Sequence, residues 1–223
     1  RLIALAPASV QEMADFVGLA FDLAFKYRNP AIILADGVIG QMMEKVVLPE
    51  QRPRLTNEEV MARCPWATFG KLKHRGPNIV TSLELDPAEM EKRNIHLQQK
   101  YAEIEEKEVR YEEIHCDDAE YLIVAFGSCA RIAQKAMEEA RAEGIKVGLL
   151  RPITLWPFPS KAIAERSRQV KGILTVELNA GQMVEDVRLA VECKVPVEYF
   201  GRLGGIVPDP DEVVTALKEK IIK

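Results

Sequence analysis

The second half of this chain repeats one pattern, a short apolar run followed by a segment with helical periodicity. The apolar runs, which we predict to be strands, are residues 121–126, 145–150, 173–177 and 197–200. The helices that follow them are predicted to begin near Ser128, Ser160, Gly181 and Asp209. Because strands and helices that alternate at this spacing form a parallel sheet covered by helices, the pattern predicts an α/β fold.

Residues 1–43 show the same alternation once, as strand, helix and strand. The helix is predicted to begin at a capping box formed by Ser9 and Glu12. The second strand, residues 31–35, is uniformly apolar, which is typical of a strand buried on both faces of a parallel sheet. One such unit cannot cover both faces of its own sheet, so we expect further strands from upstream sequence or from a partner chain. Since the chain starts at Arg1, we also expect it to be part of a longer protein.

Residues 44–117 lack this alternation of strand and helix and are interrupted by prolines. A short hairpin is predicted at residues 69–74, and Asp86 caps a highly charged helix that is predicted to reach about Arg110. The helix carries a narrow apolar stripe made of Met90, Leu97, Tyr101 and Ile104. It is either a connector that lies across a domain surface or a partner subunit, or an ordinary solvated helix packed on its own chain.

The composition argues against several classes of partner. The net charge is −4, with both signs mixed along the chain, which disfavours binding to nucleic acid or to an anionic membrane surface. Apolar runs stay well below the roughly 20 residues of a membrane-spanning helix, and there is no secretory leader pattern, so we expect a cytoplasmic protein. The cysteines lack the spacing of metal ligands, and we predict no zinc or iron–sulfur site in this chain; they are Cys64, Cys116, Cys129 and Cys193.

Cys129 is a candidate nucleophile, because it falls in the first turn of a predicted helix, where free amides favour a thiolate. A catalytic thiol also needs a base, usually a histidine. The histidines of this chain, His74, His96 and His115, all lie in the irregular region. We therefore favour the alternative in which Ser128 caps the helix and Cys129 is a small buried side chain.

Polar residues also follow other predicted strands, where sites lie in parallel sheets. Glu177, Asn179 and Gln182 gather at the end of the third strand and are candidates for recognising an anion or, chiefly, for a subunit contact, although Asn and Gly also serve as plain turn residues. Asp36 ends the strand in the N-terminal segment and could serve chemistry, but it is followed by glycine, as in a simple turn. The cluster 201–205 could cradle a phosphate, but it lacks the spacing of known phosphate loops, so a flexible loop is preferred.

Residues 151–159 contain three prolines and two aromatic residues directly after a predicted strand. Proline fixes φ and removes a backbone donor, so we predict a stiff, partly apolar loop that packs against another surface. Trp156 and Phe158 are the candidate contact residues of this loop.

Several segments together resemble one known family; they are residues 5–11, 27–30, 36–43, 81–83, 145–159 and 177–182. They are similar to the alpha subunit of thiamine-diphosphate-dependent 2-oxoacid:ferredoxin oxidoreductases. The amino-acid sequence of residues 36–43 is most similar to that of the 2-oxoisovalerate (branched-chain) type, with the 2-oxoglutarate type as a close second.

The resemblance implies a reaction, its cofactors and its partners. The family oxidatively decarboxylates a 2-oxoacid with CoA to acyl-CoA and CO₂ and reduces ferredoxin. Thiamine diphosphate with Mg would be bound by the complex, not by this segment alone. Iron–sulfur clusters would lie on other subunits, and the partners would be beta, gamma and delta-type subunits together with ferredoxin. The catalytic glutamate of the family lies upstream of the matching region, so no catalytic residue is assigned here.

The resemblance also implies a domain division. Residues 1–43 would end a pyrimidine-type domain of a thiamine enzyme, residues 44–117 would form a connector with the charged helix, and residues 118–223 would form a transketolase C-terminal-like domain. The segment would then serve mainly as scaffold and subunit interface. A non-catalytic α/β interaction module is the alternative.

Overall fold

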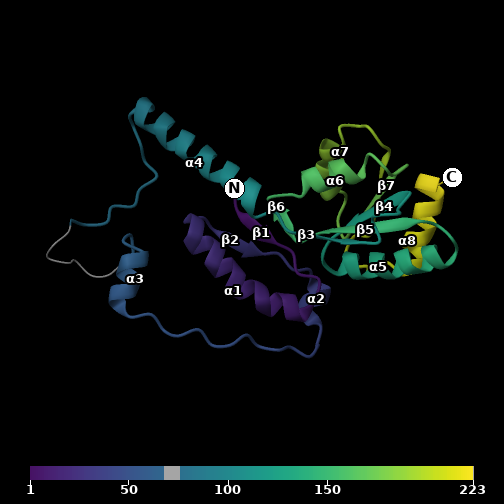
Figure 1. The fold of residues 1–223 in the computed structure, drawn as a ribbon, viewed down its shortest axis with the longest axis horizontal. Coiled ribbons are helices and arrows are strands. Elements are labelled where there is room, and N and C mark those ends of the chain that lie inside the picture. Colours follow the sequence, from purple (N-terminus) through teal and green to yellow (C-terminus); the bar gives the residue numbers. More distant parts are fainter. Residues whose placement is uncertain (68–75, 223) are drawn as a thin grey trace. The chain divides into compact units, whose positions relative to one another are not determined.

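A computed structural model of the chain describes residues 1–67 and 76–222, so the hairpin expected at residues 69–74 lies outside the described residues (Figure 1). The chain divides into two compact units, one made of Arg1–Val47 with Lys100–Lys223 and the other of Leu48–Gln99. In chain order, the elements are β1 (Ile3–Leu5), α1 (Val10–Tyr27), β2 (Ala31–Ile33), α2 (Gly37–Gln41), α3 (Asn57–Arg63), α4 (Pro87–Lys107), β3 (Tyr111–Ile114), β4 (Tyr121–Ala125), α5 (Gly127–Ala142), β5 (Val147–Pro152), β6 (Thr154–Trp156), α6 (Ser160–Arg166), β7 (Ile173–Glu177), α7 (Met183–Val191), β8 (Val197–Gly201), α8 (Pro210–Leu217) and the short π-helix η1 (Lys218–Ile222). All the strands of the described residues belong to the first unit, and the second contains α3 and the first part of α4.

The larger sheet has the strand order β3-β5-β4-β7-β8. The four strands predicted from apolar runs, β4, β5, β7 and β8, are all parallel, which confirms the α/β fold. Helices α5 and α8 cover one face, and α6 and α7 cover the other. One strand departs from the expectation of a purely parallel sheet, because β3 pairs antiparallel with β5.

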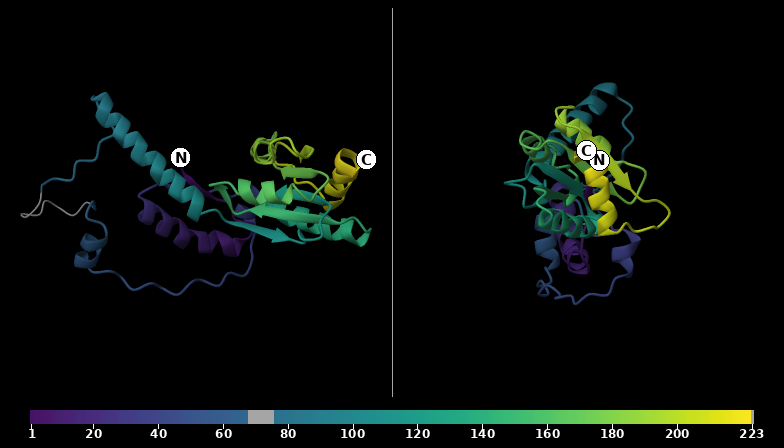
Figure 2. Two further views of the ribbon diagram at one scale, coloured as in Figure 1. Left: turned by 45° about the horizontal axis from the view of Figure 1, so that its top comes forward. Right: turned by 90° about the vertical axis from the view of Figure 1, so that its right-hand side faces the viewer.

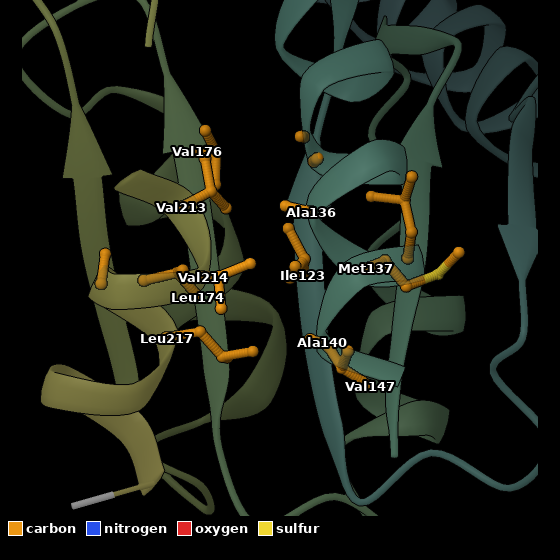
Figure 3. Close-up of a cluster of buried hydrophobic side chains, with 14 of the residues drawn as sticks. Ile123, Ala136, Met137, Ala140, Val147, Leu174, Val176, Val213, Val214 and Leu217 are labelled. Carbon is orange, nitrogen blue, oxygen red and sulfur yellow. The ribbon is translucent and has the colours of Figure 1, made fainter. Parts of the chain in front are cut away.

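One hydrophobic core fills the space between α5, α8 and the sheet (Figure 3). Ala136 and Ala140 of α5 are fully buried, and their small side chains let the helix lie close to the strands. Val213 of α8 lies beside Val176 of β7, and Val214 and Leu217 lie near Leu174. Strands that are apolar along their whole length need such cover on both faces, and a second core under α6 and α7 supplies it.

The N-terminal segment forms a second, smaller sheet with the order β2-β1-β6. Helix α1 packs on this sheet through Leu23 and Tyr27, which contact Ile3 of β1. β6 comes from the second half of the chain and pairs antiparallel with β1. The two sheets are therefore interleaved in the sequence, because β6 of the smaller sheet lies between β5 and β7 of the larger one.

Strand β2 is an edge strand in this chain, with Ile32 38% exposed and Leu34 just beyond it 49% exposed, so the described residues do not supply the cover expected from upstream sequence or a partner. One prediction was wrong: residues 151–159 are not simply a loop, because β5 continues to Pro152 and Thr154–Trp156 forms β6. Proline is tolerated there since it is the last residue of β5 and needs to donate no further ladder hydrogen bond.

The second unit contains α3 and the first part of α4. Thr56 and Glu59 form a capping box at α3, and Asp86 accepts hydrogen bonds from the first amides of α4. Of the residues in the stripe of α4, Ile104 is fully buried against Leu23 and Tyr27 in the larger unit. The end of this helix therefore packs on its own chain (Figure 2).

A buried carboxylate ties the end of α4 to α1. Glu108 accepts hydrogen bonds from Lys26 Nζ at 2.6 Å and from the Tyr27 hydroxyl at 2.6 Å, and it forms an ion pair with Arg110 at 2.9 Å. Burial alone would raise the pKa of Glu108, but these three partners hold it below its usual value. The ionised form is therefore the one that stabilises the fold.

We expect Glu108→Gln to lower the free energy of unfolding by about 2–3 kcal/mol at neutral pH, since it removes one partner of a buried charge network. A carboxylate with a depressed folded pKa contributes stability above its unfolded pKa of about 4.3, and that stability is lost as pH falls through the folded value. Denaturant unfolding at a series of pH values should thus show the difference between the two proteins shrinking below about pH 4.

The matched control is Glu103→Gln, which removes an exposed pair with Lys107 and should change stability by less than about 0.5 kcal/mol. An equal loss in both variants, or a difference that stays constant with pH, would contradict the assignment.

Candidate functional site

The carboxyl ends of β2, β4 and β7 border one cavity of about 170 Å³ in the larger unit. It is lined mostly by apolar atoms together with two carboxylates, those of Asp36 and Glu177. The residues that line it are Leu34, Ala35, Asp36, Phe126, Cys129, Glu177, Leu178 and Asn179. The structure therefore brings together three of the strand ends that the sequence singled out.

Asp36 connects two helices from distant parts of the chain. Its Oδ1 accepts hydrogen bonds from the amides of Val38 and Ile39 at 3.0 Å each, at the start of α2. Its Oδ2 accepts one from the amide of Ser128 at 2.8 Å, in the first turn of α5. A carboxylate at a helix N-terminus satisfies free amides and the helix dipole, and Asp36 does this for two helices at once.

The prediction that Ser128 caps α5 was wrong. Phe126 occupies the N-cap position, no side chain of its own segment caps the helix, and Ser128 lies inside the first turn. Gly127 between them has φ = 61°, and a Cβ there would lie 2.8 Å from Asp36 Oδ2. The cap comes from a residue 92 positions away, which short-range sequence patterns do not reveal.

Glu177 also caps a helix, but the helix is α7, which directly follows it in the chain. This side chain is almost fully buried at the end of β7, and it accepts hydrogen bonds from the amides of Gln182, Met183 and Val184 at 2.8–3.1 Å. The side chain of Asn179 accepts one from the Gly181 amide at 2.7 Å. The turn interpretation thus holds for Asn179, while Gln182 is exposed at the start of α7.

Cys129 has the environment of a structural thiol. It is 3% exposed, and burial, together with the nearby carboxylates of Asp36 and Glu177, raises its pKa to about 12. Two negative charges and low exposure disfavour the thiolate that a nucleophile requires. Burial as a small side chain, the favoured alternative, is therefore supported by the structure.

A second polar cluster joins α1 to the larger sheet, and sequence reasoning missed it. Arg151 on β5 is 7% exposed and donates two hydrogen bonds of 2.8 Å to Glu12 and one of 2.9 Å to Glu112. Burial alone would raise the pKa of Glu12, but the bonds from Arg151 and from the Ala8 amide hold it low. A buried charge needs a partner of opposite charge. An arginine at the end of an apolar strand could therefore have indicated this cluster from the sequence.

The same cluster changes the predicted capping box. Ser9 does cap α1, because its hydroxyl accepts the Glu12 amide at 3.1 Å. The Glu12 carboxylate, however, bonds to the Ala8 amide at 2.7 Å and to Arg151, so the reciprocal half of the box is replaced by a long-range ion pair.

The aromatic side chains of Trp156 and Phe158, which follow β5, make contacts within this chain. The Trp156 ring lies edge-on to Tyr101, with centroids 5.8 Å apart, and Phe158 packs against the core under α6 and α7. Both also line a cavity of about 730 Å³ with Tyr111 and other residues of the larger unit. In the glycine-containing segment after β8, Arg202 forms an ion pair with Glu212 and so is not free to meet a phosphate.

The described residues do not form a site that fits a diphosphate with its metal ion. The N-terminal amides of α2, α5 and α7 that face the cavity are bonded to Asp36 and Glu177, and a second anion there would meet two carboxylates. Within residues 1–67 and 76–222, no group of three His, Cys, Asp or Glu side chains is placed to bind a metal. The helices of this part of the chain are also too short or too polar to cross a membrane.

Two family models match this chain. The model "Pyruvate flavodoxin/ferredoxin oxidoreductase, thiamine diP-bdg" matches residues 1–114, and "Pyruvate:ferredoxin oxidoreductase core domain II" matches residues 119–213. The two matches meet between the end of β3 and the start of β4.

Curated relatives extend the comparison. Ketoisovalerate oxidoreductase subunit VorB of Methanothermobacter thermautotrophicus is 48% identical over 98% of this chain, which spans 60% of that relative's length. The 2-oxoglutarate synthase subunit KorA of Archaeoglobus fulgidus is 32% identical over 93% of this chain, which spans 58% of that relative's length. The chain therefore spans about three fifths of the length of these two relatives.

Two solved structures share the fold. A 2-oxoglutarate:ferredoxin oxidoreductase from Magnetococcus marinus, with 2-oxoglutarate, coenzyme A and succinyl-CoA bound, matches with a TM-score of 0.74 and 22% identity, over 98% of this chain and 42% of that one. A split-gene transketolase matches with a TM-score of 0.52 and 15% identity, over 98% of this chain and 56% of that one. At these identities, the likeness concerns the fold alone.

We expect Asp36→Asn to destabilise the chain by about 1–2 kcal/mol, because the amide can still cap α2 but can turn a donor toward the Ser128 amide. Hydrogen exchange at Ser128 should accelerate at least about tenfold. The control is Asp209→Asn, the same chemical change at the start of α8, where asparagine caps as well as aspartate. Unchanged exchange at Ser128 would show that the bridge between the helices carries no stability.

We also expect the thiols to differ in reactivity. With iodoacetamide at pH 8, exposed Cys193 should be alkylated at least about 100-fold faster than Cys129, as measured by peptide mass spectrometry. Labelling of Cys129 as fast as that of Cys193 would reopen the thiol-enzyme alternative.

Proposed function

We propose that this chain, which belongs to the pyruvate flavodoxin/ferredoxin oxidoreductase family, is part of a subunit of a 2-oxoisovalerate:ferredoxin oxidoreductase. The observation that carries the substrate type is the 48% identity to a ketoisovalerate oxidoreductase subunit, against 32% for a 2-oxoglutarate synthase subunit. The enzyme would oxidatively decarboxylate a branched-chain 2-oxoacid with CoA to acyl-CoA and CO₂ and pass the electrons to ferredoxin.

We assign residues 1–43 to the end of a pyrimidine-type domain, residues 44–117 to a connector and residues 118–223 to a transketolase C-terminal-like domain. The matches of two family models on either side of residues 114–119 support the boundary between the connector and the last domain. The open edge of β2, with Ile32 and Leu34 exposed, is where further strands of the pyrimidine-type domain would pair. The greater length of the curated relatives is consistent with such strands.

Within this proposal, the described residues act as scaffold. The carbanion chemistry would come from thiamine diphosphate with Mg, held elsewhere in the complex, and the electrons would pass through iron–sulfur clusters on other subunits. Asp36 and Glu177 fix the helices at the cavity, and Arg151 holds α1 to the larger sheet. Beta, gamma and delta-type subunits and ferredoxin would be the partners, in the cytoplasm.

We propose that the subunit contacts are made by those candidate residues whose side chains have the fewest interactions within this chain. Gln182 is exposed, and Phe158 lines the 730 Å³ cavity. Trp156 lines the same cavity but also packs on Tyr101, and the side chain of Asn179 is bonded to the Gly181 amide. Phe158 and Gln182 are therefore the stronger candidates of the four.

The test is reduction of ferredoxin or a viologen dye by the assembled complex with this subunit at full length. With thiamine diphosphate and CoA present, we expect 2-oxoisovalerate to give a kcat/KM at least about tenfold above that of 2-oxoglutarate or pyruvate. Omitting this subunit should abolish the reduction.

A preference for 2-oxoglutarate would overturn the substrate assignment while keeping the family role. An intact complex that reduces no acceptor with any of the three acids would favour the non-catalytic interaction module.

A further inference from the structure

The two sheets of the larger unit have separate hydrophobic cores. Two clusters cover the faces of the larger sheet, and a third joins α1 and the end of α4 to the smaller sheet. Among the described residues, none of these three clusters extends from one sheet to the other. Apolar burial is the main force that holds packed bodies together, and interfaces that lack it allow domains to move. The junction between the sheets is therefore a candidate for motion.

Three short stretches of chain connect the two sheets, and they lie side by side. They are residues 108–110 between α4 and β3, Ile153 between β5 and β6, and residues 157–159 between β6 and α6. The amides of Ile153 and Thr154 both donate to the Arg110 carbonyl at 3.0 Å. Val109 and Phe158 line the same cavity of about 730 Å³. Because hinges form at a few residues at the ends of elements, we call these three stretches the hinge.

Two side chains of the N-terminal segment contact α5, which covers the larger sheet. Asp36 Oδ2 accepts a hydrogen bond from the Ser128 amide at 2.8 Å, and Glu44 forms an ion pair with Arg131 at 2.6 Å. Glu44 also accepts a hydrogen bond from the Val10 amide at 3.0 Å, so it bridges α1 and α5. Ser128 and Arg131 are about one helical turn apart on the same side of α5. We call the contacts of Asp36 and Glu44 with α5 the latch.

Both contacts of the latch border cavities that residues of the two sheets' parts line together. The cavity of about 170 Å³ has Asp36 on one side and Cys129 on the other. A second cavity, of about 280 Å³, has Glu44 on one side and Arg131 on the other. Well-packed interiors leave few voids larger than a water molecule, and atoms that line a void lose dispersion contacts. The junction is therefore loosely packed, which lowers the free energy needed to separate its two sides.

We propose that the two sheets, each with its own helices, rotate as rigid bodies about the hinge, and that the latch of Asp36 and Glu44 holds the closed arrangement. The pair of Glu12 with Arg151 stays joined, because Arg151 lies two residues before Ile153 and so beside the hinge. Opening of the latch separates α2 from α5 and exposes the 170 Å³ cavity at the strand ends to solvent. Salt favours the open arrangement, since the side chains of the Glu44 pair are partly exposed.

Hydrogen exchange in the full-length subunit tests whether the two contacts of the latch open together. Glu44→Gln keeps an acceptor for the Val10 amide but removes the charge that pairs with Arg131. We expect it to accelerate exchange at the Ser128 amide at least about fivefold, although Ser128 bonds to Asp36 and not to Glu44. Arg131→Gln should have the same effect, and the double variant should not exceed either single variant. Exchange at the Thr154 amide, in the hinge, should stay unchanged.

The matched control is Glu143→Gln, which removes a comparably exposed pair with Lys218 at the other end of α5. Both partners of this pair belong to the larger sheet's part, so exchange at Ser128 should change by less than about twofold. Equal acceleration in the control would indicate general loosening of α5 and would overturn the proposal. Acceleration at Val10 alone in Glu44→Gln would also overturn it, because the two contacts of the latch would then open independently.

Distances between the two bodies test the motion itself. Spin labels are placed at Val17→Cys on α1 and Lys135→Cys on α5, with Cys193→Ser to remove the exposed native thiol. Pulsed electron paramagnetic resonance should give one main distance at about 50 mM salt and a second population at about 1 M salt. Glu44→Gln should show the second population at low salt. A sample labelled through Lys135→Cys alone measures the background from native thiols, and one unchanged distance under all conditions would refute the motion.

Discussion

The carboxylate of Asp36 is the interaction on which the arrangement of the larger unit depends. It bonds to the first turns of α2 and α5, which belong to segments 92 residues apart, and so fixes the end of β2 against the end of β4. Gly127 leaves room for this oxygen, where any Cβ would lie too close. Arg151 adds a second tie, between β5 and α1, through Glu12. Long-range bonds to helix starts thus hold the two sheets of this unit together.

Local patterns were sufficient to predict most of the larger sheet. The apolar runs of β4, β5, β7 and β8 identify parallel strands, because a strand covered on both faces must be apolar throughout. β3 could not be found in this way, since its sequence Tyr-Glu-Glu-Ile is half charged and becomes a strand only by pairing with β5. β6 is three residues long between prolines, and only its pairing with β1 makes it a strand.

The site was predictable in position but not in chemistry. Polar residues at strand ends indicated where the cavity lies, and parallel topology required those ends to meet on one edge. That Glu177 and Asp36 cap helices depends on how the chain turns after each strand, which composition does not determine. The partner of Arg151 was hidden because Glu12 had already been explained by a local capping motif.

The boundary between the two family matches separates β3 and β6 from the sheets that they join, which has a consequence for how such genes can evolve. The family matches end at residue 114 and resume at residue 119, which invites a division of the gene there. Each product of that fission would lack one strand of its own sheet and carry one strand of the other's, leaving unpaired edges on both fragments. The halves would have to recombine by fragment complementation, so lineages that redistribute these domains among separate polypeptides should break the gene elsewhere.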